Sequence, residues 1–236
     1  MKTIDINCDV GEGIKNEHLL MPHISSCNIA CGGHFGDEST IDKTIQLAID
    51  YKVKIGAHPS FPDKENFGRK IMDISDDELK ESLIQQMQLF KERVVLKSAK
   101  IHHVKPHGAL YNLIAVNQEK AILVVDVIQQ VFENVKIYVT YNSMIEKVAL
   151  ENGIEIVYEA FADRNYNDNL TLVSRSLPYA IITDKVQVLK HVKKMTKESK
   201  VRTVTCNEVE IKADTFCVHG DTKNAIEILQ YLNENL

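Results

Sequence analysis

Acidic, histidine and lysine side chains recur in this sequence where strand-like apolar runs end. Carboxylates and imidazoles are groups that move protons, and an aspartate beside several histidines is also a typical ligand set for a divalent metal ion that activates water. Both kinds of chemistry need these side chains in one place. The residues at the predicted strand ends are Asn7, Asp9, Asn28, His58, His103, Lys105, His107, Glu159 and His219.

A single buried polar residue is more often a hydrogen-bonded structural group than a catalyst. Convergence of several such residues is stronger evidence, because a core built only for stability fills these positions with aliphatic side chains. We therefore expect one polar site to which six strands contribute.

Strand-like and helix-like runs alternate along the chain, a pattern that predicts a parallel sheet with helical crossovers. Helical spacing appears around Ile41, Leu79, Ala121 and Ala225, and Ser75 to Glu78 forms a capping-box sequence. Seven strands are visible and an eighth is not secure. The predicted strands are Thr3–Val10, Ser26–Cys31, Val53–His58, Lys100–His107, Val135–Tyr141, Ile154–Phe161 and Asp214–His219.

The first predicted strand alternates apolar and polar residues, with Asp5, Asn7 and Asp9 on one face. Apolar side chains facing helices and polar ones facing a lumen suit a β/α barrel, whose chemistry lies at the carboxyl ends of the strands. An edge strand of an open doubly wound sheet gives the same alternation. We favour an α/β fold with one barrel domain over residues 1–236.

Two long connections, Pro59 to Asp73 and Ala162 to Pro178, are expected to be lids or binding loops. These loops contain Arg69, Arg164 and Arg175, whose guanidinium groups suit a carboxylate or phosphate ligand. Each arginine could equally be a solvated residue or one that only holds its own loop in place. Glycine-containing turns precede two helices, and Asp37 and Asp221 are predicted to be their N-caps. A Walker phosphate-binding sequence is absent.

The net charge of −5 gives no general attraction to nucleic acid or to an anionic membrane. No apolar run approaches the length of a membrane span, and the chain starts directly in a strand-like segment, so we expect a cytosolic protein whose partners are small molecules or proteins. Five cysteines without a Cys-x-x-Cys pair are interpreted as reduced, buried thiols.

Six stretches, in this order, resemble the LamB/YcsF family, and the match spans nearly the whole chain. They are Asp5–Gly13, Asn28–Gly32 with His34 and Gly36-Asp37, Gly56–Ser60 with Phe67-Gly68-Arg69, His103–Asn112, Glu159–Arg164 and Val218–Asp221. The resemblance implies a β/α barrel like that of the glycoside hydrolase/deacetylase superfamily, often seven-stranded. It also implies the A subunit of 5-oxoprolinase, which opens 5-oxoproline to L-glutamate with ATP hydrolysis and requires the B and C subunits.

The resemblance extends the predicted site. Asp9, His58, Lys105 and His107 are the predicted catalytic residues, with Lys105 and Arg69 stabilising phosphate or oxyanion charge and Asp9, His58 or His107 moving the proton of the attacking water. The predicted substrate-binding residues are Asn7, Glu12, Asn28, His34, Arg69, Glu159, Asp163, Arg164, Arg175, His219 and Asp221.

The sequence departs from the family at four positions. Gly33 stands where an aromatic residue is common and Phe35 where a small one is common, and Leu170 and Tyr179 replace usual glycines. Two other functions stay open. One is a metal-dependent deacetylase or amidohydrolase, and the other is a binding subunit whose partners do the chemistry.

Overall fold

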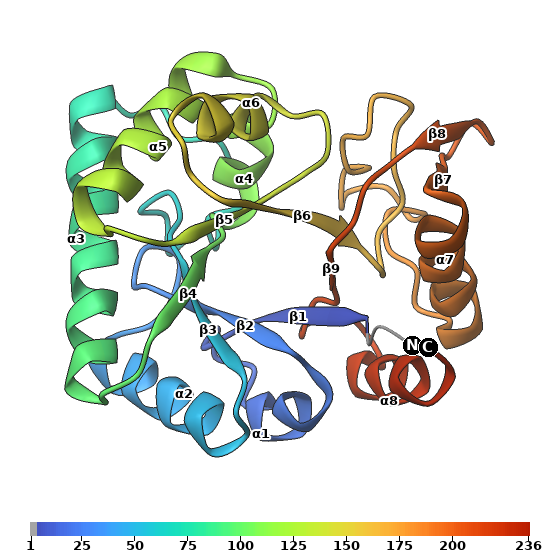
Figure 1. The fold of residues 1–236 in the computed structure, drawn as a ribbon, viewed down its shortest axis with the longest axis horizontal. Helices are drawn as coiled ribbons and strands as arrows, with labels where there is room; N and C mark the ends of the chain where they lie inside the picture. Colours follow the sequence, from blue (N-terminus) through green and yellow to red (C-terminus); the bar gives the residue numbers. More distant parts are fainter. Residues whose placement is uncertain (1–3) are drawn as a thin grey trace.

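The computed structural model describes residues 4–236 and contains a closed barrel of seven parallel strands (Figure 1). This confirms the predicted β/α barrel and its strand number. Around the barrel the strands follow the order β1-β2-β3-β4-β5-β6-β9. Their bounds are β1 Asp5–Val10, β2 Ser26–Ala30, β3 Lys54–His58, β4 Ile101–Val104, β5 Lys136–Val139, β6 Ile156–Phe161 and β9 Thr215–Cys217.

Helices cover the outside of the barrel (Figure 1). On α2, the predicted face of Ile41, Ile45 and Ala48 is fully buried, as periodicity 3.6 requires. A short antiparallel pair, β7 Lys200–Arg202 and β8 Glu208–Glu210, lies outside the barrel and was not predicted. The helices are α1 Glu17–Leu20, η1 Met21–His23, α2 Glu38–Asp50, α3 Asp76–Leu96, α4 Gly108–Ile114, α5 Gln118–Val131, α6 Met144–Glu151, α7 Lys185–Glu198 and α8 Ala225–Asn235.

Two of the three predicted helix starts are confirmed. The Ser75 and Glu78 side chains form the capping box of α3, and the Asp37 carboxylate accepts from the Thr40 N–H at the start of α2. The prediction for Asp221 is wrong, because α8 begins later, after Asn224, and the Asp221 carboxylate binds arginines instead.

The fourth strand ends at Val104, before the predicted His107, because Pro106 has no N–H to donate. The chain nevertheless stays in register with the extension of β3. Lys105 N donates to Ala57 O at 2.9 Å, and His107 N donates to Pro59 O at 2.8 Å. These bonds hold Lys105 and His107 at the carboxyl end of the barrel.

Polar side chains fill the lumen, as the alternation in β1 predicts. The Ser26 and Tyr138 hydroxyls lie 3.0 Å apart although β2 and β5 are not neighbours, so this bond crosses the barrel. Asn28 is fully satisfied: its amide nitrogen donates to Asn7 Oδ1 and Asp9 Oδ1, and its oxygen lies 2.6 Å from His103 Nε2. This column of hydrogen bonds connects the middle of the barrel to its carboxyl end.

The His103 ring occupies the lumen because Gly56 has no side chain. A Cβ on Gly56 would lie 2.2 Å from His103 Nε2. His103 also stacks on Tyr138, with ring centroids 3.8 Å apart. His103 is therefore a buried structural residue beneath the site, and burial lowers its pKa well below the usual value.

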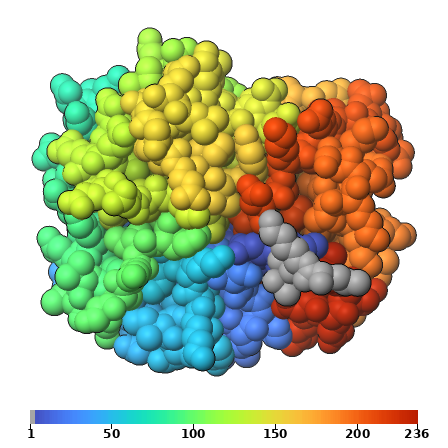
Figure 2. All heavy atoms as spheres, in the orientation of Figure 1, coloured from blue at the N-terminus to red at the C-terminus, as the bar shows by residue number. Residues whose placement is uncertain are grey.

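All five cysteines are free thiols, and Cys8, Cys27, Cys31 and Cys217 are buried as predicted. Cys206 is exposed, which corrects the prediction; it lies in the turn between β7 and β8, outside the barrel. Among residues 4–236, no helix combines the length and apolar character that crossing a bilayer needs. Figure 2 shows the molecule as spheres from the same side as Figure 1, with the blue to green first half of the chain on the left and below and the orange to red last part on the right.

His191 on α7 should make the protein sensitive to acid. Burial lowers its pKa to about 4, and its Nε2 is buried without a hydrogen-bond partner among the described residues. The unfolded chain binds this proton near pH 6.5, so stability should fall as the pH drops from about 6.5 towards 4. Between pH 7 and pH 5, urea unfolding should show wild type losing about 2 kcal/mol more than His191→Phe. Equal losses in the two proteins would contradict this.

Candidate functional site

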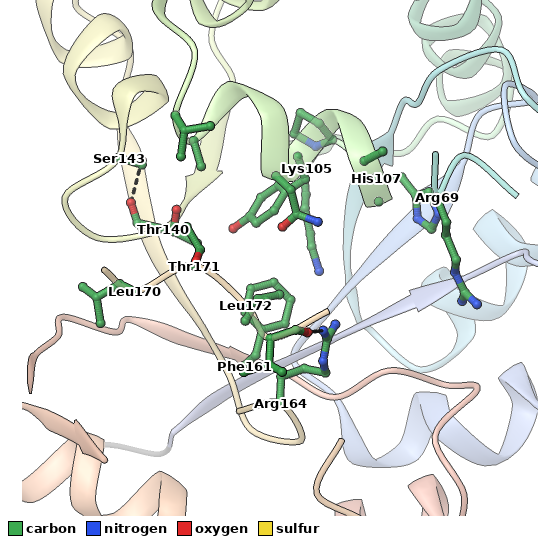
Figure 3. A pocket seen from close by; sticks show the side chains of 18 of the residues that line it. Arg69, Lys105, His107, Thr140, Ser143, Phe161, Arg164, Leu170, Thr171 and Leu172 are labelled. Atoms are coloured by element: carbon green, nitrogen blue, oxygen red, sulfur yellow. Dashed lines mark hydrogen bonds between the residues drawn. The ribbon is translucent and has the colours of Figure 1, made fainter. Parts of the chain in front are cut away.

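A cavity of about 1320 Å³ opens at the carboxyl ends of the strands, where the predicted site lies. Its floor is polar, and its wall includes α4, the start of α6 and residues 167–176. Figure 3 shows Arg164 and Leu172 facing Lys105 and His107 across this space. The volume exceeds the roughly 300–1,000 Å³ usual for small-molecule sites.

The predicted site residues divide into two groups. Those that line the cavity are Asp9, Glu12, His58, Arg69, Lys105, His107, Arg164, Arg175 and His219. The others lie behind them and contact them through hydrogen bonds or ion pairs: Asn7, Asn28, His34, Glu159, Asp163 and Asp221. The second group therefore positions the first.

Lys105 lies at the centre of the floor, 2% exposed, between two carboxylates. Its Nζ is 2.9 Å from Asp9 Oδ1 and 2.9 Å from Glu159 Oε1. Burial would lower the pKa of Lys105, but Asp9, Cys217 and Glu159 hold it well above the usual value. The ammonium group therefore stays charged and joins β1, β4 and β6 across the lumen.

One oxygen of Asp9 is held and the other is free to react. Oδ1 accepts from Asn28 and from Lys105, whereas Oδ2 lies 3.5 Å from His58 Nε2. Burial would raise the pKa of Asp9, but the neighbouring His58 and the Lys105 ammonium keep it well below the usual range. The carboxylate is therefore ionised and correctly oriented to accept a hydrogen bond from a molecule in the cavity.

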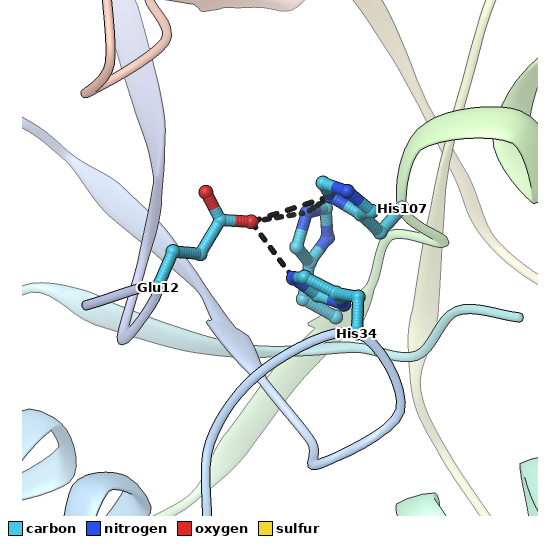
Figure 4. A group of neighbouring side chains, drawn as sticks. Glu12, His34 and His107 are labelled. Atoms are coloured by element: carbon cyan, nitrogen blue, oxygen red, sulfur yellow. Dashed lines mark hydrogen bonds and ion pairs between the residues drawn. The ribbon is translucent and has the colours of Figure 1, made fainter. Parts of the chain in front are cut away.

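A cluster of Glu12 and three histidines lies beside Asp9 (Figure 4). Glu12 Oε1 is 2.9 Å from His34 Nε2 and 3.3 Å from His107 Nδ1, and His107 Nδ1 is 2.9 Å from His58 Nε2. These residues come from the turn after β1, the turn after β2, the end of β3 and the segment after β4. Strand ends that are far apart in sequence thus meet at one point of the rim.

His219 follows β9 and is held by Asp163, which follows β6. Asp163 accepts from His219 Nδ1 at 2.9 Å, from the His219 backbone N–H at 3.0 Å, and from the Thr222 hydroxyl. Burial would raise the pKa of Asp163, but these contacts hold it below the usual value. Because Nδ1 is occupied, His219 offers only its other nitrogen to a molecule in the cavity.

Three charged residues join the loops at the mouth. The guanidinium groups of Arg69 and Arg175 both contact the Asp221 carboxylate. Arg164 is different: it is buried, and it donates to the carbonyl oxygens of Val173 and Ala180, so it pins its own loop. The described part of that loop also contains an antiparallel bridge between Tyr166 and Leu172, so it is less irregular than predicted.

Sequence reasoning missed Tyr111, which lines the cavity and donates to Glu159 Oε2 at 2.6 Å. It also missed Phe161, over which the Lys105 ammonium lies at 5.4 Å from the ring centroid. Both residues belong to stretches that resemble the family, His103–Asn112 and Glu159–Arg164. Their position in those stretches was the available signal.

Packing explains why Gly33 and Phe35, on either side of His34, depart from the residues common in the family. A Cβ on Gly33 would lie 2.3 Å from Gln86 Oε1, so an aromatic side chain does not fit there. The Phe35 ring instead occupies the space beside Gly13, where a Cβ would be 2.4 Å from the ring. Leu170 has φ of 64°, a conformation that favours glycine, whereas Tyr179 has no positive φ.

The fold is a closed β/α barrel, and carboxylates, histidines and a lysine converge in a cavity at its carboxyl end. These features are those of barrel enzymes that act on small molecules. The LamB/YcsF family model matches residues 4–236. This chain belongs to the LamB/YcsF family, which confirms the resemblance.

Similar proteins cover the chain almost completely. The 5-oxoprolinase A subunit of Campylobacter jejuni subsp. doylei is 41% identical, covering 100% of this chain and 94% of the relative. The 5-oxoprolinase A subunit of Staphylococcus aureus strain MSSA476 is 40% identical, covering 99% and 95%. The crystal structure of the lactam utilization protein from Thermus thermophilus is 32% identical, covering 99% and 96%, with a TM-score of 0.91.

A more distant structure shares the fold alone. It is a GH113 β-1,4-mannanase, 12% identical with a TM-score of 0.57, and the match covers the whole of both chains. It supports the expected relation to glycoside hydrolase barrels in architecture, and it says nothing about substrate.

Proposed function

We propose that this chain is the A subunit of an ATP-dependent 5-oxoprolinase, working with B and C subunits on 5-oxoproline. The observation that carries the proposal is the 40–41% identity over nearly the full length of proteins that are 5-oxoprolinase A subunits by name. The polar cavity at the barrel mouth supplies groups for hydrolysis. The proposal also places the chain in the cytosol, where its co-substrate ATP is available.

The reaction needs activation because a lactam is a stabilised amide. Transfer of a phosphoryl group from ATP to the lactam oxygen would make the ring carbon more electrophilic. Water then adds to that carbon, the ring C–N bond breaks with a proton passing to nitrogen, and a second water releases phosphate and L-glutamate. The chain must therefore hold an anionic ring, take a proton from water and return one to nitrogen.

Asp9 is the group best placed to accept the proton of the attacking water. Its Oδ2 borders the cavity, while Oδ1 is held by Asn28 and Lys105. His219, which lines the cavity within 4.8 Å of Asp9 and is oriented by Asp163, is placed to return a proton to the leaving nitrogen. Lys105 lies between Asp9 and Glu159 and keeps Asp9 charged, and it also borders the cavity, where it would stabilise phosphate or oxyanion charge as predicted.

The two mouth arginines would bind the carboxylate of 5-oxoproline or a phosphate, since Arg69 and Arg175 share a single carboxylate, Asp221. Arg175→Gln is expected to raise KM for 5-oxoproline about 10-fold with little change in kcat, because it removes a binding contact distant from the reacting bond. Steady-state kinetics of the assembled enzyme would test this. Arg202→Gln, at an exposed position of β7, is the control. An unchanged KM in Arg175→Gln would remove the arginine from substrate binding.

The function is tested by assembling the chain with its B and C subunits and measuring glutamate and phosphate released from 5-oxoproline and ATP. We expect coupled release in the complete assembly and none when this chain is omitted. Release by B and C alone at the same rate would show that this chain does not carry out the reaction.

A metal-dependent amidohydrolase or deacetylase is the second candidate, favoured by the cluster of Glu12 with His34, His58 and His107. It predicts hydrolysis of simple amides or N-acetyl compounds by the chain alone, without ATP. A substrate screen with the purified chain distinguishes it from the first candidate. A purely binding role for the chain would instead leave activity intact after alanine replacement of several cavity residues.

A further inference from the structure

The protons on two histidines of the Glu12 cluster can be assigned from their neighbours. His58 Nδ1 lies 2.6 Å from the carbonyl oxygen of Lys105, and His107 Nε2 lies 3.0 Å from that of Phe67. A carbonyl oxygen only accepts, so both of these ring nitrogens carry hydrogen. The remaining nitrogens, His58 Nε2 and His107 Nδ1, are therefore the ones that present lone pairs.

These two lone pairs point at each other. The nitrogens are 2.9 Å apart, and Glu12 Oε1 lies 3.3 Å from His107 Nδ1 and 3.8 Å from His58 Nε2. Three buried acceptor atoms in such proximity repel one another unless a positive charge lies between them. A proton can bridge two of them, whereas a metal ion can bind all three.

The spacing suits a small divalent cation. Ligand atoms at 2.0–2.1 Å from a tetrahedral zinc ion lie about 3.3 Å from each other, which falls within the spread of the three distances. The rings of His58 and His107 are inclined at 84°, so one point can lie in the plane of both. Each ring donates its other N–H to a backbone carbonyl, the usual support of a metal-binding histidine.

His34 is excluded as a fourth ligand by its orientation. Its ring is stacked on His107 with an interplanar angle of 5° and centroids 3.7 Å apart. An ion in the plane of one ring therefore lies outside the plane of the other. Instead His34 Nε2 donates to Glu12 Oε1 at 2.9 Å and holds the carboxylate in place.

The buried charged groups beneath the cavity also favour a cation. Asp9, Glu12, Glu159 and Asp163 are buried carboxylates, and Lys105 and Arg164 are the buried cations of residues 4–236. Four negative charges against two positive ones leave an excess of two, which a divalent ion would neutralise.

We propose that Glu12 Oε1, His58 Nε2 and His107 Nδ1 bind one zinc-like divalent cation, with His34 as a positioning residue for Glu12 and a fourth coordination position open to the cavity. Two imidazole nitrogens and one carboxylate oxygen are ligands that suit zinc or cobalt(II). An ion here lies next to Asp9, and a water molecule on it would be activated for attack. The inference concerns the proposed active site, but it does not depend on the identity of the substrate.

The test is metal binding by the full-length chain in the absence of substrate. After treatment with a chelator, the chain is titrated with Zn²⁺ and Co²⁺ by calorimetry, and the Co²⁺ complex is followed by its visible absorption. We expect one ion per chain, a higher melting temperature with Zn²⁺, and binding weakened at least ~100-fold in Glu12→Gln and His107→Gln.

His219→Asn is the matched control, because His219 belongs to a second possible ligand group, with Asp9 and Cys217. It should bind metal as wild type does. The proposal is overturned if folded wild type binds neither ion, in which case His58 and His107 share a proton, or if His219→Asn alone loses binding. Because no substrate is used, failure here is distinct from failure of the 5-oxoprolinase assignment.

Discussion

Asp9→Asn should lower kcat of the assembled 5-oxoprolinase by about 10²–10⁴-fold, the range for loss of a general base. Asparagine keeps an oxygen that can accept from Asn28 and Lys105, as Asp9 Oδ1 does now. The substitution removes the basic Oδ2 and retains most of the local packing. Glutamate release under saturating 5-oxoproline and ATP measures the effect, and a thermal melt with co-purification shows that the variant folds and assembles.

Asp5→Asn is the matched control for this experiment. Asp5 has the same side chain, in the same strand and on the same face, but lies at the other end of the barrel, where it contacts Lys54 and Thr215. Replacing Asp5 should change kcat by less than about 3-fold, because the residue lies far from the cavity and the effect should be as small as that of a surface substitution. Asp9→Asn with more than about a tenth of wild-type kcat would mean that another group accepts the proton.

Lys105→Met should lower the free energy of unfolding by about 3–5 kcal/mol, the usual cost of removing one partner from a buried ion pair. The methionine side chain is shorter than that of lysine by one heavy atom, the ammonium nitrogen, so the lost charge rather than a cavity dominates. Asp9 and Glu159 would then face each other without the ammonium that now lies 2.9 Å from each. Urea denaturation at pH 7 gives the change directly, and activity should fall as well because Asp9 loses its orientation.

Two further variants show whether charge is the cause. Lys147→Met removes an exposed lysine at the rim of the same cavity and should change stability by less than about 0.5 kcal/mol. Lys105→Met combined with Glu159→Gln should be less destabilised than the sum of the single variants, because one of the unpaired charges is gone. A loss below about 1 kcal/mol in Lys105→Met would contradict the central role of this ion pair.

The sequence pattern, together with the family motifs, was enough to predict the barrel and the layer of residues at its carboxyl end. Period-two alternation in β1 placed Asn7 and Asp9 in the lumen, and period-3.6 spacing placed Ile41 and Ile45 of α2 in the core. Both patterns are local, so they can be seen without knowing the tertiary structure. The two errors of these patterns also had local causes. Strand β4 ends early because of Pro106, and Cys206 is exposed because it lies in a hairpin too short to give a clear pattern.

Tertiary structure decided which side chains interact. Arg69 and Asp221 are 152 residues apart in sequence, and Lys105 and Asp9 are 96 apart. The sequence predicted Asp221 as a helix cap and a substrate-binding residue, and Lys105 as a group that stabilises phosphate or oxyanion charge, because each residue type favours those roles taken singly. Closure of the barrel brings the two lumen carboxylates to Lys105 and the two arginines to Asp221, and these ion pairs cannot be predicted from either residue taken singly.

The same reason applies to the Glu12 cluster. The positions of Glu12, His58 and His107 at strand ends predict that they lie near the mouth. The direction of each lone pair does not, because it depends on which backbone carbonyl each ring meets, Lys105 for His58 and Phe67 for His107. Strand periodicity and the family motifs predict which residues make up the site. The orientation of its hydrogen-bond donors and acceptors is set only when β1, β3 and β4 come together in the closed barrel.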